Sequence, residues 1–297
     1  MSAHNITLLD GGMGRELERI GAPFKQPEWS ALALMQAPNL IADVHRNFIT
    51  AGAQVITTNT YALVPFHIGE ACFQARAFEL ALQAAQIARD TVNKTVTTSP
   101  IKIAGCIPPA FGSYRPDLFD PTRVTDILSP LLRAQEALID VWLVETVSSS
   151  QEATAVVNTI KQFSDKPIWL SFSLTNRHDL TLPPSLRSQE PLDSVIPVLE
   201  QLDTVLFNCS QPEEMEEAIT FARLHNSDIT IGAYANSFSE VKRTHDANAM
   251  LSSLREDVTP EKYLRYAQRW VNAGATIIGG CCGIGPEHIS ALTTLQQ

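Results

Sequence analysis

The stretch Ile277-Ile278-Gly279-Gly280-Cys281-Cys282-Gly283 places two adjacent cysteines between glycines, directly after a short apolar run. Neighbouring side chains on a regular strand point to opposite faces. Two adjacent thiols therefore reach one common partner only where the backbone leaves strand geometry, and glycine permits that departure because it has no Cβ. We interpret this stretch as the end of a buried strand at which the chain turns and presents both thiols together.

A third cysteine stands after another apolar run, where Cys209 follows Val205-Leu206-Phe207-Asn208. Thiolates from Cys209, Cys281 and Cys282 predict a zinc (Zn²⁺) site with one position left open for a substrate sulfur, since structural zinc sites are closed by four protein ligands. A redox-active or an inert dithiol is the alternative. Redox pairs, however, usually separate their thiols by two residues near the start of a helix.

Short β-branched apolar runs alternate with longer helical patterns along the chain. The expected strands are Ile6–Met13, Gln54–Tyr61, Ile101–Ile107, Val141–Val147, Ile168–Leu174, Thr204–Ser210, Asp228–Tyr234 and Ala275–Cys281. The expected helices are Asn39–Ala51, Phe73–Asn93, Val124–Leu138, Gln151–Phe163, Leu192–Gln201, Glu213–Leu224, Pro260–Ala273 and a short one from Pro286. Eight such units predict an α/β protein with a (β/α)₈ TIM barrel as the single domain of residues 1–297. A doubly wound open sheet is the alternative.

Three connections that follow expected strands are long: Pro108–Arg123, Thr175–Pro191 and Ala235–Thr259. All three lie at the carboxyl ends of strands, the face on which barrel enzymes place their active sites. The third is polar and charged, and two interpretations stand equally beside each other, a lid over the site and a solvated excursion.

The composition restricts the classes of partner. The formal net charge is −10 without a basic cluster, which argues against nucleic acid and anionic membrane surfaces. No apolar run approaches the ~20 residues that span a bilayer, and Met1–Asn5 lacks the features of a secretory signal. We therefore expect a cytoplasmic protein, in which unpaired cysteines are more often metal-binding or catalytic than bridged. No feature indicates an oligomeric state.

Polar residues stand at the ends of several expected strands, where a buried polar group is costly unless it is hydrogen-bonded. Asp10-Gly11 ends the first strand, Tyr61 the second, Glu145 lies in the fourth, and Asn236 follows the seventh. Their convergence on one barrel mouth suggests a site. Individually they have plainer interpretations: a turn for Asp10-Gly11, a rim carboxylate for Glu145, and packing for Tyr61. Cys106 ends an expected strand and is interpreted as a small buried hydrophobic residue, with a place in the lining of a pocket as the alternative.

Segments from the first to the last expected strand resemble the homocysteine S-methyltransferase family. These segments are Leu9-Asp10-Gly11-Gly12-Met13-Gly14-Arg15-Glu16-Leu17, Trp29-Ser30-Ala31, Thr57-Thr58-Asn59-Thr60-Tyr61, Leu143-Val144-Glu145-Thr146, Asn208-Cys209-Ser210 and Gly279-Gly280-Cys281-Cys282-Gly283. The resemblance implies a zinc-dependent barrel that methylates the sulfur of homocysteine to give methionine. Its implied partners are homocysteine and a cationic methyl donor, which is S-methylmethionine, S-adenosylmethionine or betaine in different members.

The resemblance also assigns roles to individual residues. Cys209, Cys281 and Cys282 match the zinc ligands, and Glu145 matches the residue that holds the homocysteine amino group. Asp10 and Gly11 match the loop over that substrate. Trp29 and Tyr61 match aromatic positions near the donor or the metal. No catalytic side chain is implied beyond the zinc-activated substrate thiolate.

Two loops depart from the family pattern. Tyr234-Ala235-Asn236-Ser237-Phe238 replaces a common Tyr-Pro-Asn-Ser-Gly, and Pro108–Asp117 replaces a Gly-Pro-Tyr-Gly pattern. Asn236 is nevertheless expected at the substrate site and, with Tyr61, is a candidate for the fourth metal position when substrate is absent. Because both loops lie where a donor would approach, the sequence leaves the donor open.

Two other functions are alternatives. One is the homocysteine-side module of a folate- or cobalamin-dependent methyltransferase, which normally belongs to a longer multidomain chain. The other is a non-catalytic thiol–zinc barrel that acts as a metal or redox sensor. Only three cysteines are placed for the metal, which favours an open catalytic site over a closed structural one.

Overall fold

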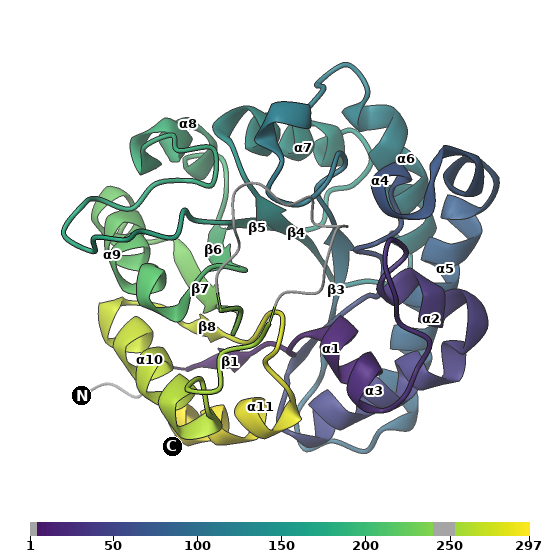
Figure 1. The fold of residues 1–297 in the computed structure, drawn as a ribbon, viewed down its shortest axis with the longest axis horizontal. Helices are drawn as coiled ribbons and strands as arrows, with labels where there is room; N and C mark the ends of the chain where they lie inside the picture. Colours follow the sequence, from purple (N-terminus) through teal and green to yellow (C-terminus); the bar gives the residue numbers. More distant parts are fainter. Residues whose placement is uncertain (1–4, 240–252) are drawn as a thin grey trace.

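The computed structural model describes residues 5–239 and 253–297. Within these residues, eight parallel strands form one sheet in the order β1-β8-β7-β6-β5-β4-β3-β2, and a parallel bridge between Leu9 and Val55 joins its two edges (Figure 1). The predicted (β/α)₈ barrel is confirmed. The strands are β1 (Thr7–Leu8), β2 (Val55–Thr57), β3 (Lys102–Ile107), β4 (Val141–Val147), β5 (Ile168–Phe172), β6 (Thr204–Asn208), β7 (Thr230–Tyr234) and β8 (Ile277–Ile278).

Helices form a ring around the strands (Figure 1). Those at predicted positions are α3 (Pro38–Thr50), α5 (Glu70–Lys94), α6 (Val124–Gln135), α7 (Ser150–Lys161), η2 (Leu192–Val195) with α8 (Ile196–Leu199), η3 (Pro212–Glu214) with α9 (Met215–His225), α10 (Pro260–Ala273) and α11 (Pro286–Leu292). The bounds of α10 match the prediction because both ends carry strong signals. The Thr259 side chain accepts a hydrogen bond from Lys262 N–H at the start, and Gly274 adopts the left-handed φ of 116° at the end.

Several short elements were not predicted: α1 (Met13–Arg19), α2 (Ser30–Gln36), α4 (Pro65–Ile68), η1 (Pro116–Leu118) and η4 (Thr293–Gln296). With at most seven residues, they are too short to show a helical repeat, and packing against the barrel stabilises them. The expected strand Ile6–Met13 was wrong beyond Leu8, because α1 begins at Met13.

Four other predicted strands also ran too far at their carboxyl ends: Gln54–Tyr61, Ile168–Leu174, Thr204–Ser210 and Ala275–Cys281. The strands predicted to end at Ile107, Val147 and Tyr234 do end there. Side chains replace the regular ladder there. Thr58, just past β2, accepts a hydrogen bond from Cys106 N–H through its hydroxyl at 2.9 Å. Asn208, the last residue of β6, accepts one from Thr146 N–H at 3.0 Å. Regular strand pairing thus ends where polar side chains accept hydrogen bonds from the backbone of another strand.

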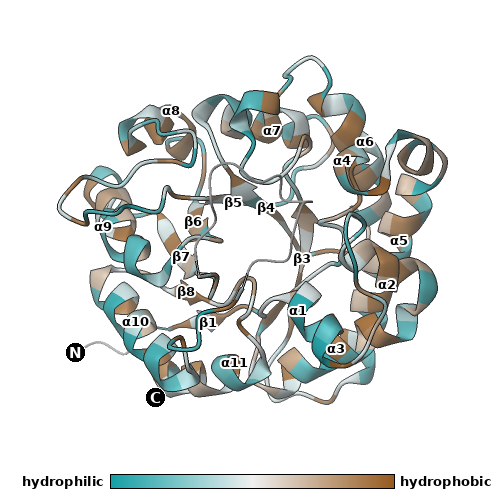
Figure 2. Ribbon diagram, viewed as in Figure 1, coloured by the Kyte–Doolittle hydropathy of each residue, from teal (hydrophilic) through white to brown (hydrophobic). Residues whose placement is uncertain are grey.

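The barrel interior is filled with apolar side chains below the carboxyl ends of the strands. One buried cluster contains Leu9, Val55, Ala104, Val141, Leu143, Trp169, Leu206, Tyr234 and Ile277. A larger cluster lies between strands and helices. Hydrophilic and hydrophobic residues are interspersed along the ring of helices, as expected for helices with one buried face (Figure 2). Since side chains alternate along a strand, the residues two further on from Ala104 and Leu143, Cys106 and Glu145, also point inward.

Two of the predicted long connections lie within the described residues, and η1 is part of the first. The third connection begins and ends within the described residues, but its residues 240–252 lie outside them. The two interpretations of this connection, a lid and a solvated excursion, therefore concern residues outside the described part of the chain. Among the described residues, no helix has both the length and the apolar character needed to cross a membrane.

Candidate active site

A cavity of about 710 Å³ opens at the carboxyl ends of the strands. This volume is in the range of small-molecule sites. Its lining includes segments that follow β1, β2, β6 and β8. The lining residues include Asp10, Arg15, Phe24, Trp29, Tyr61, His67, Tyr114, Glu145, Cys209, Phe238, Ser239, Ser253, Cys281 and Cys282.

Three cysteine side chains meet at one end of this cavity, and we call Cys209, Cys281 and Cys282 the sulfur cluster. Their ligand atoms all lie within 4.8 Å of one another, and Sγ of Cys281 is 2.7 Å from Sγ of Cys209. In the described part of the chain, no other group of three or more histidine, cysteine or acidic side chains has such an arrangement. Residues separated by 72 positions in the chain are therefore brought to one point.

The backbone at the sulfur cluster departs from strand geometry in the manner that adjacent thiols require. Cys209 lies in the left-handed region with φ 49°, a conformation that costs free energy in a residue other than glycine. Cys281 N–H donates to the Ala235 carbonyl at 2.9 Å, and Ser237 N–H donates to the Cys282 carbonyl at 2.9 Å. Gly283 has φ 83°, and a Cβ there would lie 2.0 Å from the Ser237 hydroxyl oxygen. Glycine is needed at this turn.

The electrostatics of the cluster favour one thiolate in the protein alone. Hydrogen bonds from the Cys281 and Cys282 thiols hold the pKa of Cys209 well below its usual range. The pKa values of Cys281 and Cys282 are raised, chiefly because each shares a hydrogen bond with Cys209. Three thiolates this close together need a compensating cation, and soft sulfur ligands are those that zinc and other thiophilic ions prefer.

Two acidic side chains lie elsewhere on the same mouth, and we call Asp10 and Glu145 the carboxylate pair. Asp10 accepts hydrogen bonds from Thr57, from the N–H at 2.7 Å and from the hydroxyl at 3.0 Å. Burial nevertheless raises the pKa of Asp10 to about 8 and that of Glu145 to about 7. Carboxylates in such surroundings gain most from a positively charged partner.

Sequence reasoning had treated Cys106 as packing, but the structure places it against Glu145. The Cys106 thiol donates to Oε2 of Glu145 at 3.1 Å, and its pKa lies well above the usual range because the thiol is buried. The backbone of Cys106 is fixed in turn, since Thr60 donates its hydroxyl hydrogen to the Cys106 carbonyl at 2.8 Å. Only the alternation of side chains along β3 could have signalled this contact.

Aromatic side chains form another wall of the cavity. The rings of Phe24 and Trp29 are 5.7 Å apart, and those of Trp29 and His67 are 6.4 Å apart. The Tyr61 hydroxyl lies 2.6 Å from that of Ser113. The predicted residues Trp29 and Tyr61 are thus both at the cavity, while His67 was not singled out from the sequence.

Tyr114 and Asn236 also lie near Cys209. Tyr114, which sequence reasoning missed, donates its hydroxyl hydrogen to the Cys209 carbonyl at 3.3 Å. Its φ of 63° marks strained backbone that composition does not reveal. Asn236 is buried outside the cavity lining, and its side-chain oxygen accepts from Phe238 N–H at 3.2 Å. A hydrogen bond from Asn236 also contributes to the lowered pKa of Cys209.

Fold and site together define the class: a (β/α)₈ barrel with a cysteine cluster and a carboxylate pair at the face where such barrels carry out chemistry. A family model described as homocysteine S-methyltransferase matches residues 7–295, and the chain belongs to that family. The resemblance seen in the sequence is confirmed.

Individual relatives span nearly the whole chain. Homocysteine S-methyltransferase 1 of Zea mays is 28% identical over 99% of this chain and 95% of its own length. Homocysteine S-methyltransferase YbgG of Bacillus subtilis is 29% identical over 98% of this chain and 95% of its own. The metallated form of the homocysteine methyltransferase MmuM from Escherichia coli superimposes with a TM-score of 0.78 at 26% identity, covering 98% of this chain and 96% of that one.

Proposed function

We propose that this protein transfers a methyl group from a cationic donor to the sulfur of homocysteine, giving methionine, and that Zn²⁺ bound by Cys209, Cys281 and Cys282 assists the transfer. The observation that carries the proposal is the convergence of three thiols, from two distant strand ends, on a cavity that also presents two carboxyl groups. Membership of the homocysteine S-methyltransferase family supports it.

The sulfur cluster fits zinc by its chemistry. Three thiolates and one open position are a donor set that zinc accepts readily, and four-coordinate structural sites would need a further protein ligand. Bound there, zinc would make a substrate thiol, whose pKa is ordinarily about 8.5, deprotonate near neutral pH and thus become nucleophilic. No protein base is then needed at the sulfur.

The carboxylate pair suits the ammonium group of the acceptor. Glu145 points into the barrel mouth, and both Glu145 and Asp10 line the cavity. Burial raises the pKa values of both side chains, so an ammonium group would stabilise their ionised forms. With the sulfur held at the cluster and the ammonium at the carboxylates, the acceptor would be fixed at two points, which favours in-line methyl transfer.

The aromatic wall suits the donor. A sulfonium or quaternary ammonium donor carries a positive charge that disappears during methyl transfer, and aromatic faces attract such cations by about 0.5–2 kcal/mol. Trp29 and Tyr61 are the faces that we assign to this role. Asp10 and Gly11, at the turn after β1, would cover the acceptor, while Asn236 would act indirectly through Cys209.

The test is metal analysis combined with a product assay. Purified protein should contain one zinc per chain and form methionine from homocysteine with at least one of S-methylmethionine, S-adenosylmethionine and betaine, assayed in parallel. Selenocysteine is a useful second acceptor because a relative from Astragalus bisulcatus, 25% identical, is named selenocysteine methyltransferase. Stoichiometric zinc without product from any donor would favour a metal or redox sensor instead. Full activity in metal-free protein would exclude the role of zinc.

A further inference from the structure

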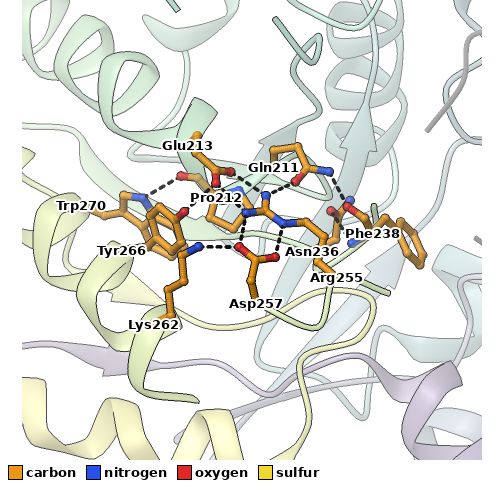
Figure 3. A network of polar contacts seen from close by, with 10 residues as sticks. All are labelled: Gln211, Pro212, Glu213, Asn236, Phe238, Arg255, Asp257, Lys262, Tyr266 and Trp270. Atoms are coloured by element: carbon orange, nitrogen blue, oxygen red, sulfur yellow. Dashed lines mark hydrogen bonds and ion pairs between the residues drawn. The ribbon is translucent and has the colours of Figure 1, made fainter. Parts of the chain in front are cut away.

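We propose that Arg255 is a positioning residue for the sulfur cluster. Its guanidinium binds Gln211 and Glu213, which follow Cys209 in the chain (Figure 3). The backbone of Arg255 belongs to the segment that supports Cys282, so the two halves of the cluster keep their relative placement. The proposal rests on the metal site of the proposed function and adds to it a residue that touches neither metal nor substrate.

The support of Cys282 begins with a short antiparallel stem. Ser237 N–H donates to the Cys282 carbonyl at 2.9 Å, and Arg255 N–H donates to the Ser237 carbonyl at 2.7 Å. Phe238 and Leu254 form an antiparallel bridge, and Ser239 N–H donates to the Ser253 carbonyl at 2.9 Å. Phe238, Ser239 and Ser253 also line the cavity. The stem therefore connects the backbone of a cluster cysteine to the wall of the site.

The side chain of Arg255 fixes this stem to the chain that follows Cys209. It donates to Oε1 of Gln211 at 2.6 Å and to the two carboxylate oxygens of Glu213 at 2.9 and 2.8 Å. It also donates to both carboxylate oxygens of Asp257 at 3.0 and 2.9 Å. All five N–H donors of the guanidinium thus have an acceptor in a planar arrangement that lysine cannot reproduce.

Gln211 provides a second connection between Arg255 and the stem. While its oxygen accepts from Arg255, its side-chain nitrogen donates to the Phe238 carbonyl at 2.5 Å (Figure 3). Gln211 is two residues past Cys209, and between them Ser210 accepts a hydrogen bond from Asn236 N–H at 3.1 Å. A displacement of Arg255 would therefore be passed to the turn that carries the strained Cys209.

The network is anchored on the outer ring. Tyr266 of α10 donates its hydroxyl hydrogen to Oε1 of Glu213 at 2.5 Å, Lys262 pairs with Asp257, and Trp270 Nε1 donates to the Pro212 carbonyl at 3.2 Å (Figure 3). Helix α10 is followed by β8, and Cys281 and Cys282 come shortly after that strand. Arg255 thereby connects the segments that follow β6 and β7 to α10, and the cluster cysteines follow β6 and β8.

A second arginine provides a matched control. Arg177, in the loop after β5, binds Glu214 at 2.6 Å and Glu217 at 2.8 Å, and its side chain is 4% exposed against 19% for Arg255. Its remaining side-chain contacts are with Leu180 and Leu182 in its own loop. Arg177 thus fastens a long loop to the start of α9 without contacting the segments around Cys282.

The experiment measures the Zn²⁺ dissociation constant of the full chain by competition with a chromophoric chelator. Arg255→Ala should weaken zinc binding about tenfold to a hundredfold, the usual cost of removing a residue that orients metal ligands. Arg255→Lys should bind zinc more tightly than Arg255→Ala but more weakly than the wild-type protein. Arg177→Ala should leave the zinc dissociation constant within about twofold of the wild-type value. Urea unfolding of the metal-free proteins should nevertheless show that Arg177→Ala lowers the free energy of unfolding at least as much as Arg255→Ala does. The visible spectrum of the Co²⁺-loaded protein should change for Arg255→Ala alone.

Further variants and outcomes make the test decisive. Should Arg255→Ala not fold, Gln211→Ala removes the bridge to the stem and should weaken zinc binding about fivefold, the effect of one hydrogen bond. Unchanged zinc affinity in the folded variants, or equal losses in Arg255→Ala and Arg177→Ala, would overturn the positioning role while leaving the proposed function intact. A wild-type protein that binds no zinc would overturn the metal site and this role together. Zinc binding without methyl transfer would overturn only the activity.

Discussion

The sulfur cluster and the carboxylate pair lie on the same cavity but are stabilised in different ways. Protein groups satisfy much of the carboxylate pair: Thr57 donates twice to Asp10, and Cys106 donates to Glu145. The thiols of the sulfur cluster are held chiefly by hydrogen bonds with one another. In the described residues, hydrogen bonds from other protein groups orient the carboxylate pair, whereas the sulfur cluster brings three potential metal ligands to one point.

The two ends should therefore respond differently to substitution, with loss of function at the sulfur cluster and weakened binding at the carboxylate pair. A ligand removed from the cluster removes part of the donor set on which ion binding depends, and ion affinity falls steeply. A carboxylate removed from the pair removes one contact to one substrate. Substitutions at the sulfur cluster and at the carboxylate pair should therefore have separable effects.

Cys281→Ser tests the sulfur end. A serine hydroxyl does not ionise near neutral pH and is a poor ligand for a thiophilic ion. We expect loss of stoichiometric zinc, measured by elemental analysis, and loss of detectable methionine formation. Cys72→Ser is the matched control, because Cys72 lies in α5, apart from the cluster, and should change neither quantity. A metal-free Cys281→Ser protein with wild-type activity would contradict the comparison.

Glu145→Ala tests the carboxylate end. Loss of one partner of a partly desolvated charge pair costs about 2–3 kcal/mol, so the dissociation constant of homocysteine should rise roughly 30- to 150-fold by calorimetry. Zinc content should not change. Glu152→Gln is the control: burial likewise raises the pKa of Glu152 to about 7, but this residue lies in α7 and accepts from Ser148 N–H, outside the cavity lining. Unchanged homocysteine affinity in Glu145→Ala would remove Glu145 from its role.

The sequence predicted the sulfur cluster more fully than the contacts of the carboxylate pair. Adjacent cysteines between glycines have few structural uses, and the alternation of apolar strands with helices fixed which strand ends would meet. Both the barrel and the gathering of Cys209, Cys281 and Cys282 could therefore be predicted. Their role as zinc ligands remains a prediction, as do the roles of Asp10, Gly11, Glu145, Trp29, Tyr61 and Asn236.

The unpredicted parts depend on contacts between segments distant in the chain. Tyr114 contacts Cys209 from a long loop, and the path of that loop cannot be predicted from its length. Arg255 lies in a charged loop, where the sequence does not distinguish it from an ordinary surface arginine. Cys106 looked like packing because the sequence shows its apolar neighbours and not Glu145. Local patterns specify elements, whereas these residues are specified by the crossing of loops over the barrel mouth.

Glu145→Gln tests the carboxylate end through the pH dependence of the free energy of unfolding. Because burial raises the pKa of Glu145 from 4.5 to about 7, the folded protein binds this proton more tightly than the unfolded chain. Its contribution to stability is complete below pH 4.5 and is lost as the pH rises towards 7. Glutamine does not ionise, so metal-free Glu145→Gln should gain on the order of 2 kcal/mol relative to wild type between pH 5 and pH 8. Urea unfolding curves with parallel pH dependence for the two proteins would contradict this.

Cys106 provides the smallest and most specific test, because it is a cysteine that serves the carboxylate end. Cys106→Ala removes the donor to Glu145 and should weaken homocysteine binding about two- to tenfold. Since that hydrogen bond lowers the pKa of Glu145, its loss should also move the pH dependence of homocysteine binding to higher pH. Cys106→Ser retains a donor and should restore both quantities. Zinc content should be unaffected in both variants, because the cluster does not include Cys106. Loss of zinc in Cys106→Ala would show that the two ends are coupled through β3 and β4, and that the separation drawn between them is wrong.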